Sequence, residues 1–304
     1  MGALNQKRSG LKSEQLNSNL EITIPYPPLQ ISQGKKSIRD YNLYFDLIKF
    51  DLKDELIEVF PPIGYLVGNL FIGESVKCNF INYNNDRFYS NQLYVTGLFS
   101  RGSMFFSVKN KGQGYAFRIH PVIGYHFLKI SMTELVDRQI RVSDVLQMNN
   151  ALLRKLEHNE RIESIDNKFF QQILWEMLPE KCSFLDDPIY HAVNNIIANR
   201  GNVRIQNLAS ACYMSERTLR RHFLRKVGLS PQAYARIWKI NHAIDFIQKN
   251  PTLSLEEVAW RIGYYDVAHL SHDFKSMVKI PPSMVSKNLG PLATSYLNNN
   301  GIVN

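Results

Sequence analysis

The sequence predicts a protein that combines a β-sandwich or jelly-roll-like N-terminal domain, a helical connector and an all-helical C-terminal domain. Three observations support this fold class. Short aromatic and β-branched runs alternate with turn residues after about position 37. Apolar residues at helical spacing follow from about position 121. Near the end, one pattern of apolar and turn residues occurs twice.

The length of 304 residues is enough for about two domains of ~150 residues each, and 44% of the residues are hydrophobic. Changes in residue composition and hydrophobic pattern along the chain suggest five parts. We expect a flexible arm over 1–36, a β-rich regulatory or sensor domain over 37–130, a helical connector over 131–186, a DNA-binding domain over 187–290 and a flexible tail over 291–304.

The β-rich part contains six candidate strands separated by turn residues such as those at 82–86, 100–102 and 110–114. Many short strands at this spacing are typical of sandwiches and jelly rolls. The candidates are Tyr41–Ile48, Gly64–Ile72, Val76–Ile81, Leu93–Phe99, Met104–Val108 and Gly114–Ile119.

The next part is expected to be helical over Val142–His158 and Lys168–Leu178. Asp187 then precedes a proline that suits the first position of a helix. This helix carries one apolar face and ends at Gly201.

The repeat near the end joins two similar helical units. Leu219 and Leu270, Phe223 and Phe274, and Pro231 and Pro282 are each 51 positions apart, whereas Ala209 and Ala259 are 50 apart. Two such units predict two helix-turn-helix modules.

The first unit begins with a short helix, Ile205–Cys212, and its second helix is expected over Glu216–Val227 after the N-cap Ser215. If Leu219 and Phe223 face the core, a basic surface faces outward. Arginine can donate two hydrogen bonds to guanine or pair with phosphate. The candidate DNA contacts here are Arg217, Thr218, Arg220, Arg221 and Arg225.

A long helix from Pro231 to Lys249 is apolar on a wide surface, so we expect it to connect the two units. In the second unit, Ser254 and Glu257 form a capping-box pattern, and Asp266 caps a helix over Val267–Val278. Its exposed face has fewer cationic side chains, which predicts less specific DNA contact. The candidates are Val267, Ala268, His269, Ser271, His272 and Lys275.

Positive charge is concentrated in this part of the chain. Residues 201–290 hold 13 Lys and Arg against six Asp and Glu, and so carry +7 of the formal net charge of +9. Clustered Lys and Arg displace the counterions that surround DNA, which favours DNA as a partner.

The stretch from about Ile189 to Leu289 resembles the arabinose-regulator (AraC/XylS) family of bacterial transcription factors. The resemblance rests on LASACYMSERTLRRHFLRKVGLSPQAY, on VAWRIGYYDVAHLSHDFK and on the proline after each second helix. It implies two DNA-contacting helices in successive major grooves, activation of transcription and RNA polymerase as a partner. The sequence departs from this pattern at two positions. Lys279 stands where the family usually has glycine, and Tyr213 holds the turn position that Gly263 fills in the second unit.

The N-terminal part is similar to the sensor-type domain of a subgroup of these regulators. The similar features are the turn at Gly97–Ser100 and the stretches Tyr115–Pro121 and Tyr125–Ser131. This resemblance implies an architecture but no ligand. Arg118 lies in an apolar strand and is the candidate ligand contact, with an internal partner as the favoured alternative.

Other site chemistry is not indicated by the sequence. Cys78, Cys182 and Cys212 are far apart, which predicts neither a disulfide framework nor a cysteine metal site. His120 and His126 lack the pattern of a cupin metal site, and core or surface roles fit them better. We expect no metal, no cofactor and no catalytic residues.

The first twenty residues lack the apolar core of a signal peptide, and no apolar run of ~18 residues occurs, so we expect a cytoplasmic protein without a membrane span.

The sequence suggests three alternative functions. The first is a sequence-specific transcription regulator controlled by a small-molecule effector or a homodimer contact. The second is an enzyme that uses the modules for DNA targeting, as some DNA-alkylation repair proteins do, but the cysteine spacing argues against it. The third is a small-molecule-sensing β-barrel protein with weak or non-specific DNA binding, which the poorly charged second helix supports.

Overall fold

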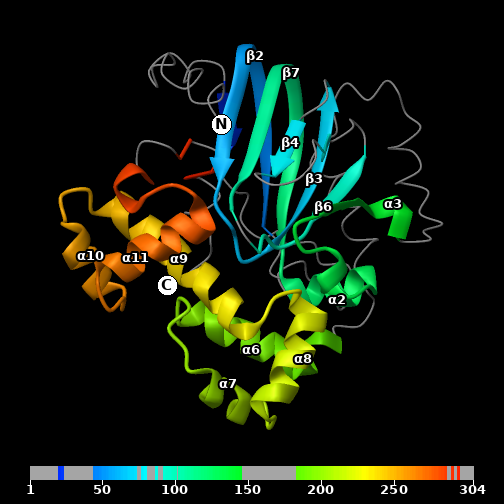
Figure 1. The fold of residues 1–304 in the computed structure, drawn as a ribbon. Helices are drawn as coiled ribbons and strands as arrows, with labels where there is room; N and C mark the ends of the chain where they lie inside the picture. The colour runs from blue at the N-terminus through cyan, green and yellow to red at the C-terminus, as the bar shows by residue number, and fades with distance from the viewer. Residues whose placement is uncertain are drawn as a thin grey trace.

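The computed structural model describes residues 20–23, 44–73, 77–80, 86–87, 92–100, 102–145, 183–285, 289–290 and 293–294. Its N-terminal half is a β-sheet and its C-terminal half is helical (Figure 1). The expected fold class is therefore confirmed at the level of a β-rich region followed by a helical region.

Two long antiparallel strands form the centre of the sheet. β2 (Tyr44–Phe60) pairs with β7 (Met104–Ile119) from Tyr44 opposite Arg118 to Phe60 opposite Met104. The register shifts between Leu52 and Leu56, which marks an irregularity in the ladder. This pair stands upright above the helices in Figure 1.

The other strands extend this pair into one hydrogen-bonded sheet, and every pairing is antiparallel. The order is β1-β2-β7-β3-β6-β8, while β4 pairs with β7 and β5. β7 therefore has β2 along one edge, and β4 and then β3 along the other. The bounds are β1 Leu20–Thr23, β3 Leu66–Gly73, β4 Lys77–Phe80, β5 Asp86–Arg87, β6 Leu93–Thr96 and β8 Gln139–Arg141.

The sheet differs from the expectations in several features, among them β5, which overlaps the turn expected at 82–86. β7 is continuous, although a turn was expected at 110–114, because these residues pair with β2 and Gly114 also pairs with Phe71 of β3. An added Cβ at Gly114 would lie 2.3 Å from the Phe71 ring, so glycine permits the close contact rather than a turn. β2 likewise continues beyond Ile48 to Phe60 because β7 pairs with it throughout.

Two further differences lie in parts of the chain where no strand was expected. β1 lies within the segment expected to be a flexible arm, where it pairs with β2. β8 lies in the expected helical connector, where it pairs with β6. In both places the partner strand decides the local structure rather than the local sequence.

Short helices connect the sheet to the C-terminal half: α2 (Pro121–Leu128), the 3₁₀ turn η2 (Met132–Glu134) and α3 (Val142–Val145). The expected helix over Val142–His158 lies outside the described residues beyond Val145, and the expected helix over Lys168–Leu178 lies wholly outside them.

The helical half agrees closely with the expected elements. A 3₁₀ turn, η3, precedes α6, whose N-cap is Asp187 as expected. α8 and α9 have the expected bounds, and the last expected helix is α11 followed by a π turn, η4. The bounds are η3 Ser183–Asp186, α6 Pro188–Ala198, α7 Ile205–Ala211, α8 Glu216–Val227, α9 Pro231–Lys249, α10 Leu255–Arg261, α11 Val267–Asp273, η4 Phe274–Val278 and η5 Pro282–Met284.

α9 lies between the two helical units, with α6, α7 and α8 around one end and α10 and α11 around the other (Figure 1). Ten of its 19 residues are buried, and they lie on more than one face of the helix. Its wide apolar surface is therefore covered by both units, as expected for the connecting helix.

The sheet and the helices share one continuous apolar core. The Tyr234 hydroxyl on α9 donates to the Gly64 carbonyl over 2.7 Å, and the Ser103 hydroxyl donates to the Val278 carbonyl over 2.6 Å. The connecting helix and the second unit therefore each have a polar anchor on the β-rich half. No helix within the described ranges has the length and hydropathy needed to cross a bilayer.

Candidate nucleic-acid interface

The first helix-turn-helix unit consists of α7, a turn and α8. Tyr213 adopts a left-handed conformation in the turn, with φ 54°. The Ser215 hydroxyl then accepts the Thr218 N–H, which satisfies one of the unpaired donors at the start of α8. Leu219 and Phe223 are fully buried, so the opposite face of α8 points away from the core.

The outward face of α8 is basic. Arg217, Arg220, Arg221 and Arg225 are all exposed, whereas Thr218 is half-buried beside the cap. Among the described residues, none of these arginines forms an ion pair. The structure therefore brings the candidates of the first unit onto one helix surface.

The basic surface affects its neighbour His222. Partial burial lowers the pKa of His222, and the positive charges of Arg221, Lys226 and Arg225 lower it further. The part of this lowering that comes from the three cations reflects a positive local potential, which suits a polyanionic partner.

The second unit consists of α10, a turn and α11. The capping box of Ser254 and Glu257 is present in both directions. Asp266 Oδ1 accepts the His269 N–H over 2.7 Å at the start of α11, and Leu270 is buried. The expected caps of this unit therefore form.

The candidates on α11 and η4 are divided between exposed and half-buried positions. Ala268, His269, His272 and Lys275 are exposed, while Val267 and Ser271 are half-buried. The His269 ring packs edge-on against Tyr264, with 5.0 Å between ring centroids. Lys275 is thus the one lysine or arginine among the candidates of this unit.

A buried carboxylate stabilises the second unit from inside. Asp273 is 3% exposed and accepts hydrogen bonds from Arg236 Nε of α9 over 2.7 Å and from the Tyr264 hydroxyl over 3.2 Å. Burial raises the pKa of Tyr264, and the nearby Asp273 carboxylate raises it further. These contacts fix α11 relative to α9.

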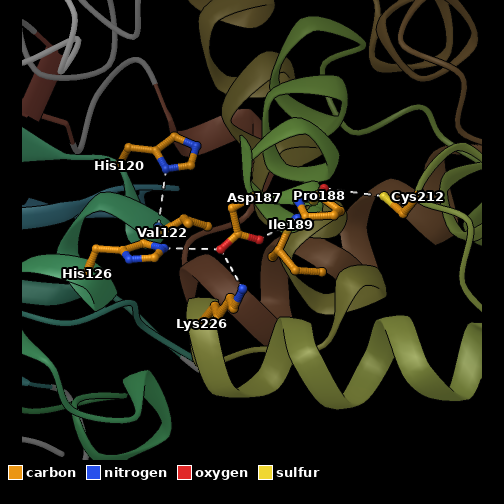
Figure 2. Close-up of polar contacts among 8 residues, drawn as sticks. All are labelled: His120, Val122, His126, Asp187, Pro188, Ile189, Cys212 and Lys226. Atoms are coloured by element: carbon orange, nitrogen blue, oxygen red, sulfur yellow. Dashed lines mark hydrogen bonds and ion pairs between the residues drawn. The ribbon is translucent and has the colours of Figure 1, made fainter. Parts of the chain in front are cut away.

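A second buried carboxylate, Asp187, connects the first unit to the β-rich half. Figure 2 shows it between His126 of α2 and Lys226 of α8. Asp187 Oδ2 accepts from His126 Nε2 over 3.2 Å and from Lys226 Nζ, while Oδ1 accepts the Ile189 N–H over 2.9 Å. Burial alone would raise the pKa of Asp187, but these hydrogen bonds and the Lys226 charge hold it below its usual value.

His120 is the N-cap of α2, and its side-chain Nδ1 accepts the Val122 N–H over 3.2 Å. It is 2% exposed and lies against the Tyr190 ring. Burial lowers its pKa to about 3, although the Asp187 charge acts in the opposite direction. His120 is therefore a neutral capping residue, and His126 is a partner of Asp187.

Sequence reasoning found the arginine surface but not the polar contacts behind it. Asp187 was recognised only as a helix start, and nothing in the local pattern connects it to His126 or Lys226. Arg236 and Asp273 are 37 positions apart, so their pairing also has no local signal. Tertiary packing alone brings these groups together.

The β-rich half contains the remaining candidate, Arg118. It is 3% exposed, and its guanidinium carbon lies 5.8 Å from the centre of the Tyr65 ring. Its role as a ligand contact stays a prediction. Among the described residues, no group of three or more His, Cys, Asp or Glu side chains could hold a metal ion.

An apolar cavity also lies in the β-rich half, between residues of the sheet and the loops beside it. It has a volume of about 40 Å³, and Asn69 and Thr96 are the polar residues in its otherwise apolar lining. Binding sites for small molecules are usually ~300–1,000 Å³, so we assign no ligand to this cavity.

Comparisons with solved structures show distant likeness. ToxT from Vibrio cholerae O395 aligns over 82% of this chain and 98% of its own, with 12% identity and a TM-score of 0.46. ToxT from Vibrio cholerae strain SCE256 bound to an unsaturated fatty acid aligns over 81% and 95%, with 13% identity and a TM-score of 0.44. A cupin domain of an XRE family transcriptional regulator from Enterobacter cloacae aligns over 34% and 98%, with 8% identity and a TM-score of 0.25. Since these TM-scores are below 0.5, we infer neither function nor ligand from them.

Comparison with protein families is more specific. No curated protein matches the chain. The helix-turn-helix domain family matches residues 208–288, which extend from α7 to just beyond η5 and include both candidate helices. Residues 208–288 therefore form a helix-turn-helix domain of the AraC type, the DNA-binding part of a transcription regulator.

Proposed function

We propose that the chain is a sequence-specific transcription regulator, an activator, whose α8 and α11 contact successive major grooves of duplex DNA. One observation carries this proposal: the exposed face of α8 presents four arginines, Arg217, Arg220, Arg221 and Arg225, without ion-pair partners among the described residues. Unpaired guanidinium groups on the second helix of such a unit suit contacts with guanine and phosphate.

The two units have different roles in this proposal. α8 supplies most of the sequence-specific contacts through Arg217, Arg220 and Arg221. α11 has no arginine among its candidate contacts and so lacks side chains that can donate two hydrogen bonds to one base. It therefore contributes thymine-methyl contacts through Val267 or Ala268 and phosphate contacts through His272 and Lys275. The second unit therefore mainly anchors the protein.

The β-rich half acts as the regulatory part in this proposal. We place its boundary with the DNA-binding domain near Asp187, where α6 begins. An effector or a homodimer contact would act through this half, and RNA polymerase is the proposed partner on DNA.

The surroundings of Cys212 do not favour a DNA-targeted alkyl-transfer enzyme. Cys212 is buried, and its thiol lies 3.3 Å from the Pro188 carbonyl. Burial raises the pKa of this thiol, and the Asp187 charge raises it further. A protonated, enclosed thiol is a poor nucleophile.

Selection from a genomic fragment library by the full chain tests the proposed function. We expect a few fragments to bind with a preference of ~10³-fold or more over random DNA at physiological salt. Equal and weak binding to every fragment would show that the chain is not a sequence-specific regulator.

Substitution of single arginines tests the assignment of α8. Arg220→Ala and Arg221→Ala should each relax base preference at one or two positions and cost ~1–3 kcal/mol in binding, as expected for a bidentate guanine contact. Binding of each variant to single-base variants of the selected fragment measures this. Lys249→Ala, an exposed lysine at the end of α9, is the control and should leave base preference unchanged. Unchanged preference in both arginine variants would contradict the assignment.

A further inference from the structure

A groove separates the basic face of α8 from a short segment of the β-rich half. It is open to solvent and has a volume of about 390 Å³. One wall carries the hydroxyls of Ser131 and Thr133, and the other carries Arg217, Arg220, Arg221 and Arg225. The groove therefore joins the candidate DNA contacts to residues outside the helix-turn-helix domain.

The hydroxyl wall is held closely against α8. An added Cβ at Gly228, the C-cap of α8, would lie 2.7 Å from the Met132 carbonyl oxygen. The Tyr125 ring of α2 lies 5.6 Å from the Arg225 guanidinium carbon. Together with the contact of Lys226 and Asp187, these contacts fix Ser131 and Thr133 beside the second half of α8.

The chemistry of the groove favours a phosphate group. The Ser131 and Thr133 hydroxyls lie 2.7 Å from each other, and Thr133 is exposed. No carboxylate lines the groove, and all four arginines remain exposed. Hydroxyl and guanidinium groups are the side chains that commonly donate to DNA phosphates.

The position of the hydroxyl wall decides which part of the DNA it would meet. The first residues of a recognition helix usually contact base edges in the major groove. Met132, which lies between Ser131 and Thr133 in the chain, packs against Gly228 at the other end of α8. At that end of the helix, the sugar-phosphate backbone at the groove edge is the nearer part of the duplex.

We propose that this groove receives a DNA backbone phosphate, so that Ser131 and Thr133 extend the DNA-binding surface beyond the helix-turn-helix domain. The proposal rests on the proposed function, because it requires α8 to lie in the major groove. The β-rich half then contributes directly to DNA affinity.

The salt dependence of binding by the full chain tests this proposal. Each additional phosphate contact made by a cation changes the slope of log K against log salt concentration by about −0.9. Thr133→Lys should therefore make the slope more negative by about that amount on the selected DNA fragment. Ile57→Lys adds the same charge to an exposed position on β2 and should change the slope much less.

Removal of the hydroxyl provides a second measurement. Thr133→Ala should weaken binding to the selected fragment about two- to tenfold, with no change in salt slope or base preference, because a neutral donor is lost. If Thr133→Lys has the same slope as Ile57→Lys and Thr133→Ala binds like the wild type, the proposal is wrong. If the wild-type chain shows no selective DNA binding, the proposed function itself fails.

Discussion

Single buried carboxylates fix both helix-turn-helix units. Asp273 connects α11 to α9 through Arg236, and Asp187 connects α8 to α2 through Lys226 and His126. A buried charge that loses its partner is strongly destabilising, whereas an exposed pair contributes little. The buried Lys226–Asp187 pair should therefore contribute more to stability than the exposed Lys249–Asp245 pair.

Replacement of Lys226 and of Lys249 compares a buried ion pair with an exposed one. Lys226→Met should lower the free energy of unfolding by on the order of 2 kcal/mol, because it leaves the buried Asp187 with fewer hydrogen bonds. Lys249→Met removes an exposed partner of Asp245 and should cost less than about 0.5 kcal/mol. Urea unfolding at neutral pH measures both, and equal effects would contradict the role of Asp187.

His120 makes stability sensitive to acid. Its folded-state pKa is about 3, below the ordinary value of 6.5, so the unfolded chain binds the proton more readily. The contribution of neutral His120 to the free energy of unfolding is complete above pH 6.5. It is lost as the pH falls toward 3, by up to about 1.4 kcal/mol per pH unit.

Replacement by asparagine tests this contribution. His120→Asn keeps an acceptor for the Val122 N–H but does not titrate. Its unfolding free energy should fall less than that of the wild type between pH 7 and pH 5 in urea titrations. Parallel pH profiles for the two proteins would rule out His120 as the source.

At the scale of elements, the ends of the helices show how closely the halves fit. Gly228 and Gly263 both adopt left-handed conformations, with φ of 93° and 77°. An added Cβ at Gly228 would approach Met132 and Val136 within 2.7 Å, whereas at Gly263 the nearest atom is 3.4 Å away. Glycine at position 228 thus serves both conformation and close packing.

This difference predicts unequal effects of alanine. Gly263→Ala should cost about 1 kcal/mol through left-handed strain alone. Gly228→Ala should cost about 2–4 kcal/mol, since it also presses α8 against the β-rich half. Thermal and urea unfolding measure both values. Similar costs for the two variants would mean that η2 moves away freely.

The helical elements were predictable because their signals are local. Ser215, Ser254 and Asp266 each cap the helix expected from the sequence, and Pro231 begins α9. Strand signals were less reliable: the turn-like residues at 110–114 lie inside β7, and β8 has too few residues to show a pattern. Pairing between distant strands overrides local preference there.

The candidate site was predictable to the same degree. Helical spacing from Leu219 and Phe223 was enough to place the arginines on the outer face of α8. Ser131 and Thr133 could not be found in this way, because they reach α8 only through the packing of the β-rich half. Sequence periodicity describes one helix surface but not what lies across from it.

For the whole molecule, the continuous core predicts cooperative unfolding. Tyr234 is fully buried and hydrogen-bonded to Gly64 across the boundary, and the Trp238 ring lies edge-on to Tyr65. The helices and the sheet therefore stabilise each other.

Calorimetry should show one transition whose calorimetric and van't Hoff enthalpies agree. Tyr234→Phe leaves the Gly64 carbonyl without its donor and should lower stability by about 1–2 kcal/mol without splitting the transition. Two separate peaks in the wild-type protein would show that the halves unfold independently.

The connection of both units to α9 has a consequence for the DNA itself. A helix of 19 residues is about 28 Å long, comparable to the ~34 Å of one turn of B-DNA. One extra base pair between the two contacted segments would move the second segment by ~3.4 Å along the duplex and about 35° around it. A single unbroken α9 cannot follow that rotation, so in the proposed function the binding sites should share one fixed spacing and vary only in their bases.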